Sequence, residues 1–310
     1  MHKTFKFISF LGLIAVTLLF LNAKKKSNII IKNNEAIIDS LKKNVSDSYE
    51  IKAVKIPDYI DFAGEQVPLH KADVRERLDR ELLVNTYWQS NGLLLLKRAN
   101  KFFPVIEPIL ADHGLPDDFK YLALAESGLM NVTSRAGASG FWQFLRATGR
   151  EYGLEVNDNV DERYNVELAT KMAARYLKKS KEKFGSWSLA AAAYNAGNGK
   201  INLRLTQQKV SNYYDLLLNP ETSRYVFRIL ALKEIISQPK KYGFAFDQED
   251  LYLPTPTYDL EVNYSIANLA DFAKKYNITY KELKLENPWL RQTKLNNASK
   301  KKYIFKIPIQ

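Results

Sequence analysis

A single carboxylate at the end of an apolar helical run could act as a general acid. Apolar residues precede Glu126 by seven, four and three positions, namely Phe119, Leu122 and Ala123, so a helix places all four side chains on one face. A carboxylate on such a face loses solvation, which disfavours its charged form and raises its pKa. A general acid that works near neutral pH needs a raised pKa. Taken alone, a glutamate at a helix end is more often a solvated surface residue.

The run around Glu126 has the start and stop signals of a short helix. Pro116 suits the first turn, where its missing N–H costs nothing, and the aspartates at 117 and 118 favour the positive end of the helix dipole. Ser127 and Gly128 end the run. We therefore expect a helix from Pro116 that ends directly after Glu126.

Three further blocks follow along the chain. After a flexible link between Gly137 and Gly140 come Phe141-Trp142-Gln143-Phe144, then Ala192-Ala193-Tyr194-Asn195-Ala196-Gly197, and later Glu221-Thr222-Ser223-Arg224-Tyr225-Val226. For each aromatic residue taken alone, packing in the core is the more common role. The amide of a residue such as Gln143 can both donate and accept hydrogen bonds to sugar hydroxyls.

The four blocks, in this order, resemble the lytic transglycosylases that cleave bacterial peptidoglycan, whose catalytic domain is similar to goose lysozyme (glycoside hydrolase family 23). The Glu-Ser pair, the Gly-x-x-Gln block, Ala-Tyr-Asn-Ala-Gly and Tyr-Val match the motifs of that family. The form Phe-Trp-Gln-Phe, with a module after the catalytic domain, is most similar to the D branch of the membrane-bound lytic murein transglycosylases. The resemblance implies a mainly α, lysozyme-like catalytic domain.

The resemblance also implies a mechanism with one carboxyl group. Glu126 would protonate the glycosidic oxygen between N-acetylmuramic acid and N-acetylglucosamine, and the same carboxylate would then take the proton of the C6 hydroxyl as a 1,6-anhydro ring closes. No water is consumed and no cofactor is needed. The residues that the motifs assign to substrate binding are Ser127, Trp142, Gln143, Tyr194, Asn195 and Tyr225.

Two other functions stay open at this point. A goose-type muramidase would hydrolyse the same bond with a second acid, for which the polar loop of residues 154–164 offers Asp158, Asp161 and Glu162. A wall-binding scaffold without catalytic activity would keep the fold, although the intact Glu126-Ser127 pair argues against it. A serine hydrolase is disfavoured because no motif places a histidine near Ser127.

The composition limits the cofactor and partner classes. The chain has 310 residues, no cysteine and three histidines, so a thiolate metal site, a disulfide framework and a lipidated cysteine are all excluded. Its formal charge of +12 and pI near 9.4 could indicate nucleic acid, but the basic residues are spread out and form no basic helix. An anionic cell-wall polymer or membrane surface fits better. Contacts with other cell-wall enzymes remain open.

The chain begins with a leader. Residues 1–26 carry Lys3 and Lys6 before an apolar run from Phe7 to Leu21, and three lysines follow. This run fits the apolar region of a secretory signal better than a full span of about 20 residues. An uncleaved membrane anchor is the alternative. Either interpretation places the rest of the chain outside the cytoplasm, in the periplasm or cell envelope.

The remaining chain divides into four parts. Residues 27–66 are polar and irregular and are interpreted as a tether, and residues 67–250 as the catalytic domain. Within that domain we expect helices over 71–98, 101–113, 146–153, 166–184, 187–194 and 221–237. Prolines mark a linker over 251–257.

Residues 258–310 form a small module with mixed patterns. We expect a strand over 258–262, helices over 269–276 and 280–286, and a strand over 303–309. This βααβ order is similar to a LysM repeat, which implies that glycan strands of peptidoglycan are a partner. The Gly-Asp turn that follows the first strand in such repeats is replaced by Tyr264-Ser265-Ile266-Ala267.

Overall fold

The computed structural model describes residues 22–27, 30–40 and 51–309 and separates the chain into residues 1–53 and 54–310. In the first unit, residues 22–27 and 30–40 are helical and exposed. The predicted leader lies outside the described residues except for residues 22–26. No described helix is both long enough and apolar enough to span a bilayer.

The segment interpreted as an irregular tether is more ordered than expected. Besides the helix at 30–40, a hairpin of strands β1 (Asp61–Phe62) and β2 (Glu65–Gln66) forms before the first helix of the second unit. Ile60, Phe62 and Val67 are buried in the main core. The prediction of an irregular segment up to Gln66 is therefore wrong for its last residues, because three spaced apolar side chains hold them against the helices.

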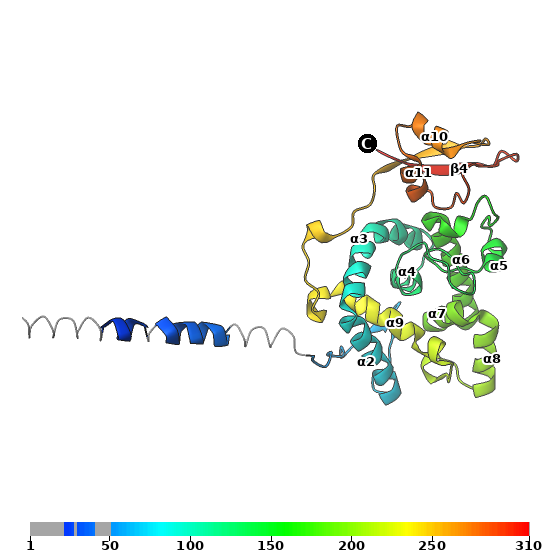
Figure 1. The fold of residues 1–310 in the computed structure, drawn as a ribbon. Helices are drawn as coiled ribbons and strands as arrows, with labels where there is room; N and C mark the ends of the chain where they lie inside the picture. Colours follow the sequence, from blue (N-terminus) through cyan, green and yellow to red (C-terminus); the bar gives the residue numbers. More distant parts are fainter. Residues whose placement is uncertain (1–21, 28–29, 41–50, 310) are drawn as a thin grey trace, which may run out of the picture. The chain divides into compact units, whose positions relative to one another are not determined.

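The second unit contains a mainly helical domain (Figure 1). Its α-helices are α2 (Ala72–Tyr87), α3 (Gln89–Asp112), α4 (Phe119–Ser127), α5 (Arg146–Glu151), α6 (Val166–Phe184), α7 (Trp187–Ala196), α8 (Asn198–Gln208) and α9 (Pro220–Ser237). Short 3₁₀ turns occur at η1 (Glu162–Tyr164), η2 (Tyr213–Asp215), η3 (Pro239–Tyr242) and η4 (Gln248–Asp250).

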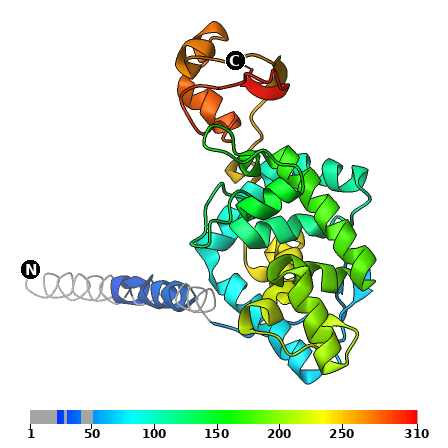
Figure 2. The same cartoon turned by 90° about the vertical axis from the view of Figure 1, so that its right-hand side faces the viewer.

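Helix α4 lies in the middle of this domain. It packs against α3 and α9, and α9 also contacts α2 and α7 (Figures 1 and 2). Phe119, Leu122 and Ala123 have no exposed surface, as their helical spacing predicted. Burial of these side chains fixes the helix that carries Glu126 in a core formed by helices from distant parts of the chain.

The helices differ from the sequence prediction in several places. Helix α4 begins at Phe119 and Pro116 lies in the turn before it, while Gly128 ends the helix in the left-handed conformation (φ 59°) as expected. The first long helical region divides at Trp88, and α3 continues through Gly92 and two prolines to Asp112. Helix α8 was not predicted, since its sequence is mostly polar.

The C-terminal module has the predicted βααβ order. Strands β3 (Thr257–Val262) and β4 (Tyr303–Pro308) pair antiparallel, with Val262 opposite Tyr303, and helices α10 (Leu269–Lys275) and α11 (Tyr280–Glu286) lie between them in the chain. The strand pair is covered by a core that includes Phe272, Leu283 and Phe305. The apolar core of the module also includes Val160 and Tyr164 of the helical domain, and the module contacts that domain through residues 155–167.

Candidate active site

Glu126 sits in the last turn of α4 with its side chain only partly exposed. The phenol of Tyr225, from α9, donates a hydrogen bond to Oε1 of Glu126. Helix α9 is held in this place because it packs along both α4 and α2. The hydrogen bond occupies one carboxyl oxygen and leaves Oε2 as the oxygen that can hold or deliver a proton.

The surroundings of Glu126 favour its protonated form. The pKa of the carboxyl is raised from its ordinary 4.5 to about 7, chiefly by burial and to a smaller extent by the negative charge of Glu221. The hydrogen bond from Tyr225 and the positive charge of Arg228 act in the opposite direction, but burial dominates. A carboxyl group with a pKa of about 7 can both donate and accept a proton near neutral pH.

Two tyrosines, the buried Tyr225 and the partly buried Tyr194, flank the carboxyl group as neutral donors. Burial and the negative charge of Glu126 raise the pKa of Tyr194 and that of Tyr225 well above 10. The Tyr194 phenol donates to the backbone carbonyl of Trp142 at 2.5 Å, and its ring packs edge-to-face against Tyr176. Tyr194 therefore binds the backbone beside the site, while Tyr225 binds the carboxyl group of Glu126 itself.

Residues 131–144, here called the Gln143 segment, fold back toward the end of α4. The amide of Gln143 donates to the carbonyls of Val132 (3.0 Å) and Gly140 (2.8 Å), while no described residue donates to its Oε1. Its backbone is left-handed (φ 49°), which is unusual for a residue other than glycine and is often found at functional sites. The remaining acceptor, Oε1, is suited to an N–H or O–H of a ligand.

The structure assigns different contacts to Ser127 and Trp142 from those expected. The Ser127 hydroxyl donates to the carbonyl of Phe141 (2.8 Å), so it fastens the Gln143 segment to α4 and does not contact Glu126. Trp142 is fully buried and its indole donates to Thr170 (2.9 Å). The substrate-binding role predicted for Trp142 is inconsistent with this burial, because no face of the ring is accessible to a sugar.

Asn195 connects the end of α7 to the first turn of α9. Its Oδ1 accepts a hydrogen bond from Thr222 (2.9 Å), and its amide lies 3.5 Å from a carboxylate oxygen of Glu221. Both α9 residues precede Tyr225 on the same helix. Asn195 thus holds the helix that carries the partner of Glu126, and it also fixes the carboxylate of Glu221.

Models of known protein families match the helical domain and the C-terminal module. Residues 104–217 match the model described as "Transglycosylase SLT domain", and residues 258–310 match "Soluble lytic transglycosylase C-terminal LysM-like domain". The chain contains an SLT domain followed by a LysM-like domain.

Individual relatives agree with this assignment. The chain is 29% identical over 252 residues to membrane-bound lytic murein transglycosylase D of Escherichia coli K12. This alignment covers 78% of this chain and 54% of that protein. It is 43% identical over 88 residues to peptidoglycan transglycosylase gp16 of Escherichia phage T7, over 27% of this chain and 7% of that protein. The chain is a distant homologue of the E. coli protein and spans about half of its length.

One solved structure shares a weaker likeness. An inactive mutant of lytic transglycosylase Slt from Pseudomonas aeruginosa aligns with 49% of this chain and 26% of its own, at 21% identity and a TM-score of 0.36. A likeness of this size carries no argument about this chain.

Three charged residues near the SLT domain site were not assigned a role from the sequence. Glu221 and Arg228 act electrostatically on Glu126, and both lie on α9 four and three positions from Tyr225. Glu81 of α2 is buried and pairs with Arg224 (2.6 Å) and, at 3.9 Å, with Arg228. The helical spacing around Tyr225 was the signal for the two α9 residues, whereas no sequence pattern connects Glu81 to them.

The loop that offered a second acid to a muramidase has other contacts. Asp161 forms a buried ion pair with Arg163 (2.7 Å), and the buried Glu162 pairs with Lys301 of the LysM-like domain (2.7 Å). Asp158 is exposed. Since their carboxylates are engaged by cations, Asp161 and Glu162 are poorly placed to activate a water molecule.

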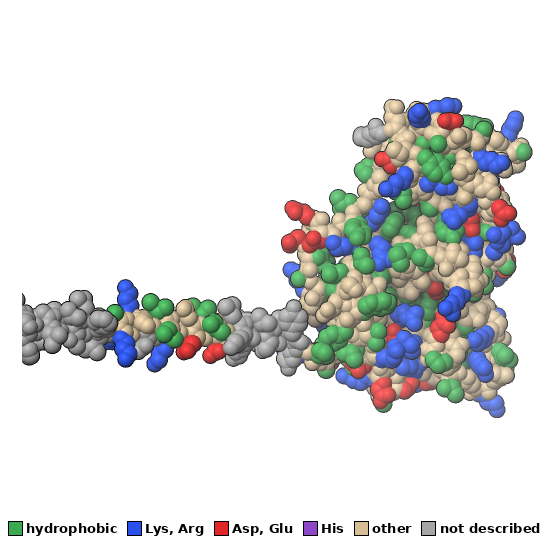
Figure 3. Space-filling view, viewed as in Figure 1, with side chains coloured by type: hydrophobic (Ala, Val, Ile, Leu, Met, Phe, Trp, Pro, Cys, Tyr) green, Lys and Arg blue, Asp and Glu red, His purple; other side chains and the backbone are tan. Residues whose placement is uncertain are grey.

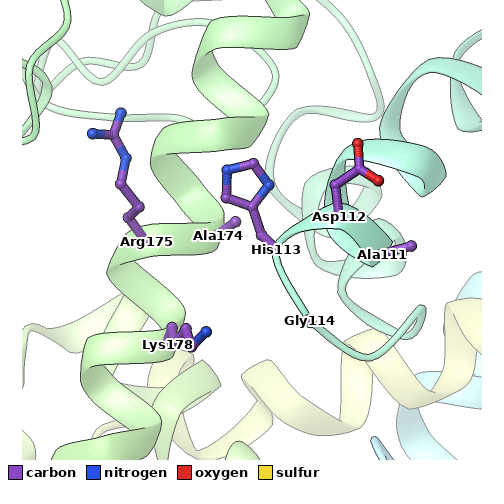
Figure 4. A pocket seen from close by; sticks show the side chains of 7 residues that line it. All are labelled: Ala111, Asp112, His113, Gly114, Ala174, Arg175 and Lys178. Atoms are coloured by element: carbon purple, nitrogen blue, oxygen red, sulfur yellow. The ribbon is translucent and has the colours of Figure 1, made fainter.

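Several cavities among the described residues lie away from Glu126. One of about 560 Å³ lies between the end of α3 and α6, where the His113 ring extends toward the helix that carries Arg175 and Lys178 (Figure 4). Another of about 510 Å³ lies between the SLT and LysM-like domains and is lined by residues that include Phe102, Phe141 and Trp289. Neither is lined by Glu126. Within the described ranges, no cluster of three His, Cys, Asp or Glu side chains could hold a metal ion.

Proposed function

We propose that this protein is a peptidoglycan lytic transglycosylase that cleaves the β-1,4 bond between N-acetylmuramic acid and N-acetylglucosamine. The observation that carries the proposal is the carboxyl group of Glu126, whose pKa is raised to about 7 and whose Oε1 accepts a hydrogen bond from Tyr225. The match to an SLT domain and the names of the relatives support the same substrate class.

The proposed reaction uses this one carboxyl group twice. The proton on Glu126 passes to the glycosidic oxygen as the bond from the muramic acid C1 to that oxygen breaks. The C6 hydroxyl of the same sugar then bonds to C1, and its proton returns to Glu126, so the enzyme is unchanged and no water is consumed. A pKa near 7 suits both steps because neither protonation state of the carboxyl is strongly disfavoured.

The substrate contacts follow from the free polar atoms at the site. The Oε1 of Gln143 is available to an acetamide N–H or a sugar hydroxyl, and we assign substrate binding to it. Ser127, Tyr194 and Asn195 act through the backbone or through α9, so we assign them to positioning the site. Trp142 belongs to the core beneath it.

Hydrolysis by a muramidase mechanism is the alternative function, with a different second carboxylate from the one that the sequence suggested. Glu221 is exposed and close enough to affect the pKa of Glu126, so it is a candidate second carboxylate in place of the loop residues. Its hydrogen-bond distance to Asn195 and its position at the start of α9 suit an electrostatic role equally well.

The deciding experiment is mass spectrometry of the soluble products released from purified peptidoglycan by the full chain and by Glu126→Gln. We expect 1,6-anhydromuramic ends, which are one water lighter than hydrolysed ends, and no release by the variant. Reducing ends that disappear in Glu221→Gln would instead establish hydrolysis. Binding to peptidoglycan without any products would make the protein a wall-binding scaffold.

We also propose that the protein works in the cell envelope, as the leader suggests, and that the LysM-like domain binds glycan. Three tyrosines lie near one another on its surface, and Tyr258 and Tyr264 are 44% and 51% exposed beside Tyr276. Tyrosine rings are common surfaces for sugars because they are apolar with a polar edge. Tyr264→Ala should weaken retention of the full chain on insoluble peptidoglycan, whereas unchanged retention would assign the domain another role.

A further inference from the structure

The LysM-like domain is joined to the SLT domain through residues 155–167, here called the docking segment. Four hydrogen bonds that use backbone atoms connect them: Asp161 N to Trp289 O (2.9 Å), Arg291 N to Asn159 O (2.9 Å), Asn159 Nδ2 to Lys294 O (2.8 Å) and Asn296 N to Asn159 Oδ1 (2.8 Å). Val160 also forms a β-bridge with Leu290. The docking segment is therefore paired with the LysM-like domain much as a short strand would be.

Apolar contacts also join the SLT domain to the LysM-like domain. Val160 is fully buried and Tyr164 is nearly so, and both belong to the core of the LysM-like domain although they precede it by about a hundred residues. The guanidinium of Arg291 stacks over the Tyr164 ring at 4.1 Å. Hydrophobic side chains also gather along this junction on the face that carries α3 (Figure 3).

Lys301 fixes the same junction by charge. Its ammonium lies 2.8 Å from Glu155 and 2.7 Å from Glu162, and the Tyr303 hydroxyl donates to Glu155 at 2.8 Å. Glu162 is buried, so its carboxylate depends on Lys301 and on the backbone N–H of Glu155 for compensation. A buried carboxylate that loses its cation is strongly destabilised.

The docking segment in turn holds the Gln143 segment. The Tyr164 hydroxyl bonds to Thr133 (2.6 Å), and Arg163 donates to the carbonyls of Gly137 (2.8 Å) and Phe144 (2.9 Å). Gly140 packs so closely that a Cβ there would lie 1.9 Å from the carbonyl oxygen of Arg163. Thr133 is thus fastened to Tyr164, which lies in the core of the LysM-like domain. The middle and the end of the Gln143 segment are fastened to Arg163, whose ion-pair partner Asp161 donates a backbone hydrogen bond to Trp289 of that domain.

We infer that the LysM-like domain positions the active site, with Lys301 and Tyr164 as positioning residues that set the Gln143 segment against the end of α4. The segment is next to Glu126 because Ser127 holds its Phe141 carbonyl and Tyr194 holds its Trp142 carbonyl. The structural part of this inference is independent of the proposed function, and its kinetic part rests on it.

The first experiment measures amide hydrogen exchange in the full chain with a matched pair of variants. Lys301→Met removes the contacts to Glu155 and Glu162, whereas Lys302→Met removes the same charge from a neighbouring side chain that pairs only with Glu261 inside the LysM-like domain. Amides of residues 134–144 should exchange about tenfold faster in Lys301→Met, because hydrogen bonds to charged groups contribute on that scale to local stability. Lys302→Met should match the wild type.

The second experiment tests the link at Tyr164. Tyr164→Phe keeps the ring in the core of the LysM-like domain and removes only the bond to Thr133. With soluble glycan fragments we expect a lower kcat with little change in KM, and we expect unchanged retention on insoluble peptidoglycan.

The outcomes separate this inference from the proposed function. Equal exchange of residues 134–144 in wild type, Lys301→Met and Tyr164→Phe would overturn positioning, whether or not the protein is an enzyme. An inactive wild type whose Lys301→Met variant exchanges faster would refute the proposed function and leave positioning intact. Loss of retention together with unchanged kcat would show that the LysM-like domain acts only as a binding module, and would also overturn the inference.

Discussion

Replacing the acid by its neutral isostere should stabilise the protein in a pH-dependent way. The pKa of Glu126 is about 7 in the folded chain and 4.5 where the side chain is solvated, as in the unfolded chain. The folded state therefore binds the proton more tightly. As pH rises from about 4.5 to about 7, the wild type loses stability, and above that range the loss is complete.

The size of the effect follows from the two pKa values. A pKa that changes from 4.5 to about 7 on folding corresponds to a destabilisation of about 3 kcal/mol once the carboxyl is ionised. Glu126→Gln removes this contribution because an amide does not titrate, and its oxygen can still accept the hydrogen bond of Tyr225. The variant should match the wild type near pH 4 and exceed its free energy of unfolding by about 3 kcal/mol near pH 8.

The assay is denaturant unfolding of both proteins between pH 4 and pH 9, followed by tryptophan fluorescence, with the wild type at pH 4 as the internal reference. A stability difference that stays constant with pH would show that packing, not ionisation, distinguishes the two proteins. A wild type that is the more stable protein at pH 8 would refute the raised pKa and, with it, the argument that Glu126 is protonated near neutral pH.

Three further outcomes test the surroundings of Glu126. Glu221→Gln removes a negative charge that raises the pKa of Glu126, so the loss of activity at high pH should move to lower pH in a pH–rate profile. Tyr225→Phe removes a hydrogen bond that lowers this pKa, so the same loss should move to higher pH; equal shifts in both variants would contradict the assignment. Gly140→Ala should unfold more easily than Gly137→Ala by at least about 1 kcal/mol in the same assay, because the two glycines share a φ of 79° but only the first lies against a backbone carbonyl.

The local spacing of apolar residues was sufficient to predict much of the secondary structure. Helix α6 and helix α11 occupy the ranges that the apolar spacing predicted, and the βααβ order of the C-terminal module is confirmed. Such elements are set by side chains within a few turns of one another. The division at Trp88 is different, because no glycine or proline marks it in the sequence; α2 packs against α9, whereas α3 packs against α6.

The parts of the site that depend on distant residues could not be found in this way. Glu126 and Tyr225 were both identified by their motifs, but their hydrogen bond joins residues 99 positions apart in the chain. Burial reversed the expectation for Trp142, since a ring in a motif can serve the core as readily as a ligand.

The docking segment shows most clearly why charge alone misleads in a sequence. Residues 154–164 are polar and lack helical periodicity, so they were interpreted as a solvated loop with acids available for catalysis. Instead, Glu155 and Glu162 pair with Lys301, which lies more than 130 residues further on, and Asp161 pairs with Arg163. Val160 is fully buried and enters the core of the LysM-like domain. A polar segment becomes structural when its charged side chains pair with buried partners. The same pairing that removes Glu162 from catalysis connects the LysM-like domain to the Gln143 segment.

The variant Lys301→Met tests both whether Glu162 can act as a second acid and whether the C-terminal domain positions the site. It frees the carboxylate of Glu162 and loosens the Gln143 segment. Activity that falls in this variant while its products keep anhydro ends would indicate positioning, whereas a change to reducing ends would indicate a carboxylate newly able to activate water.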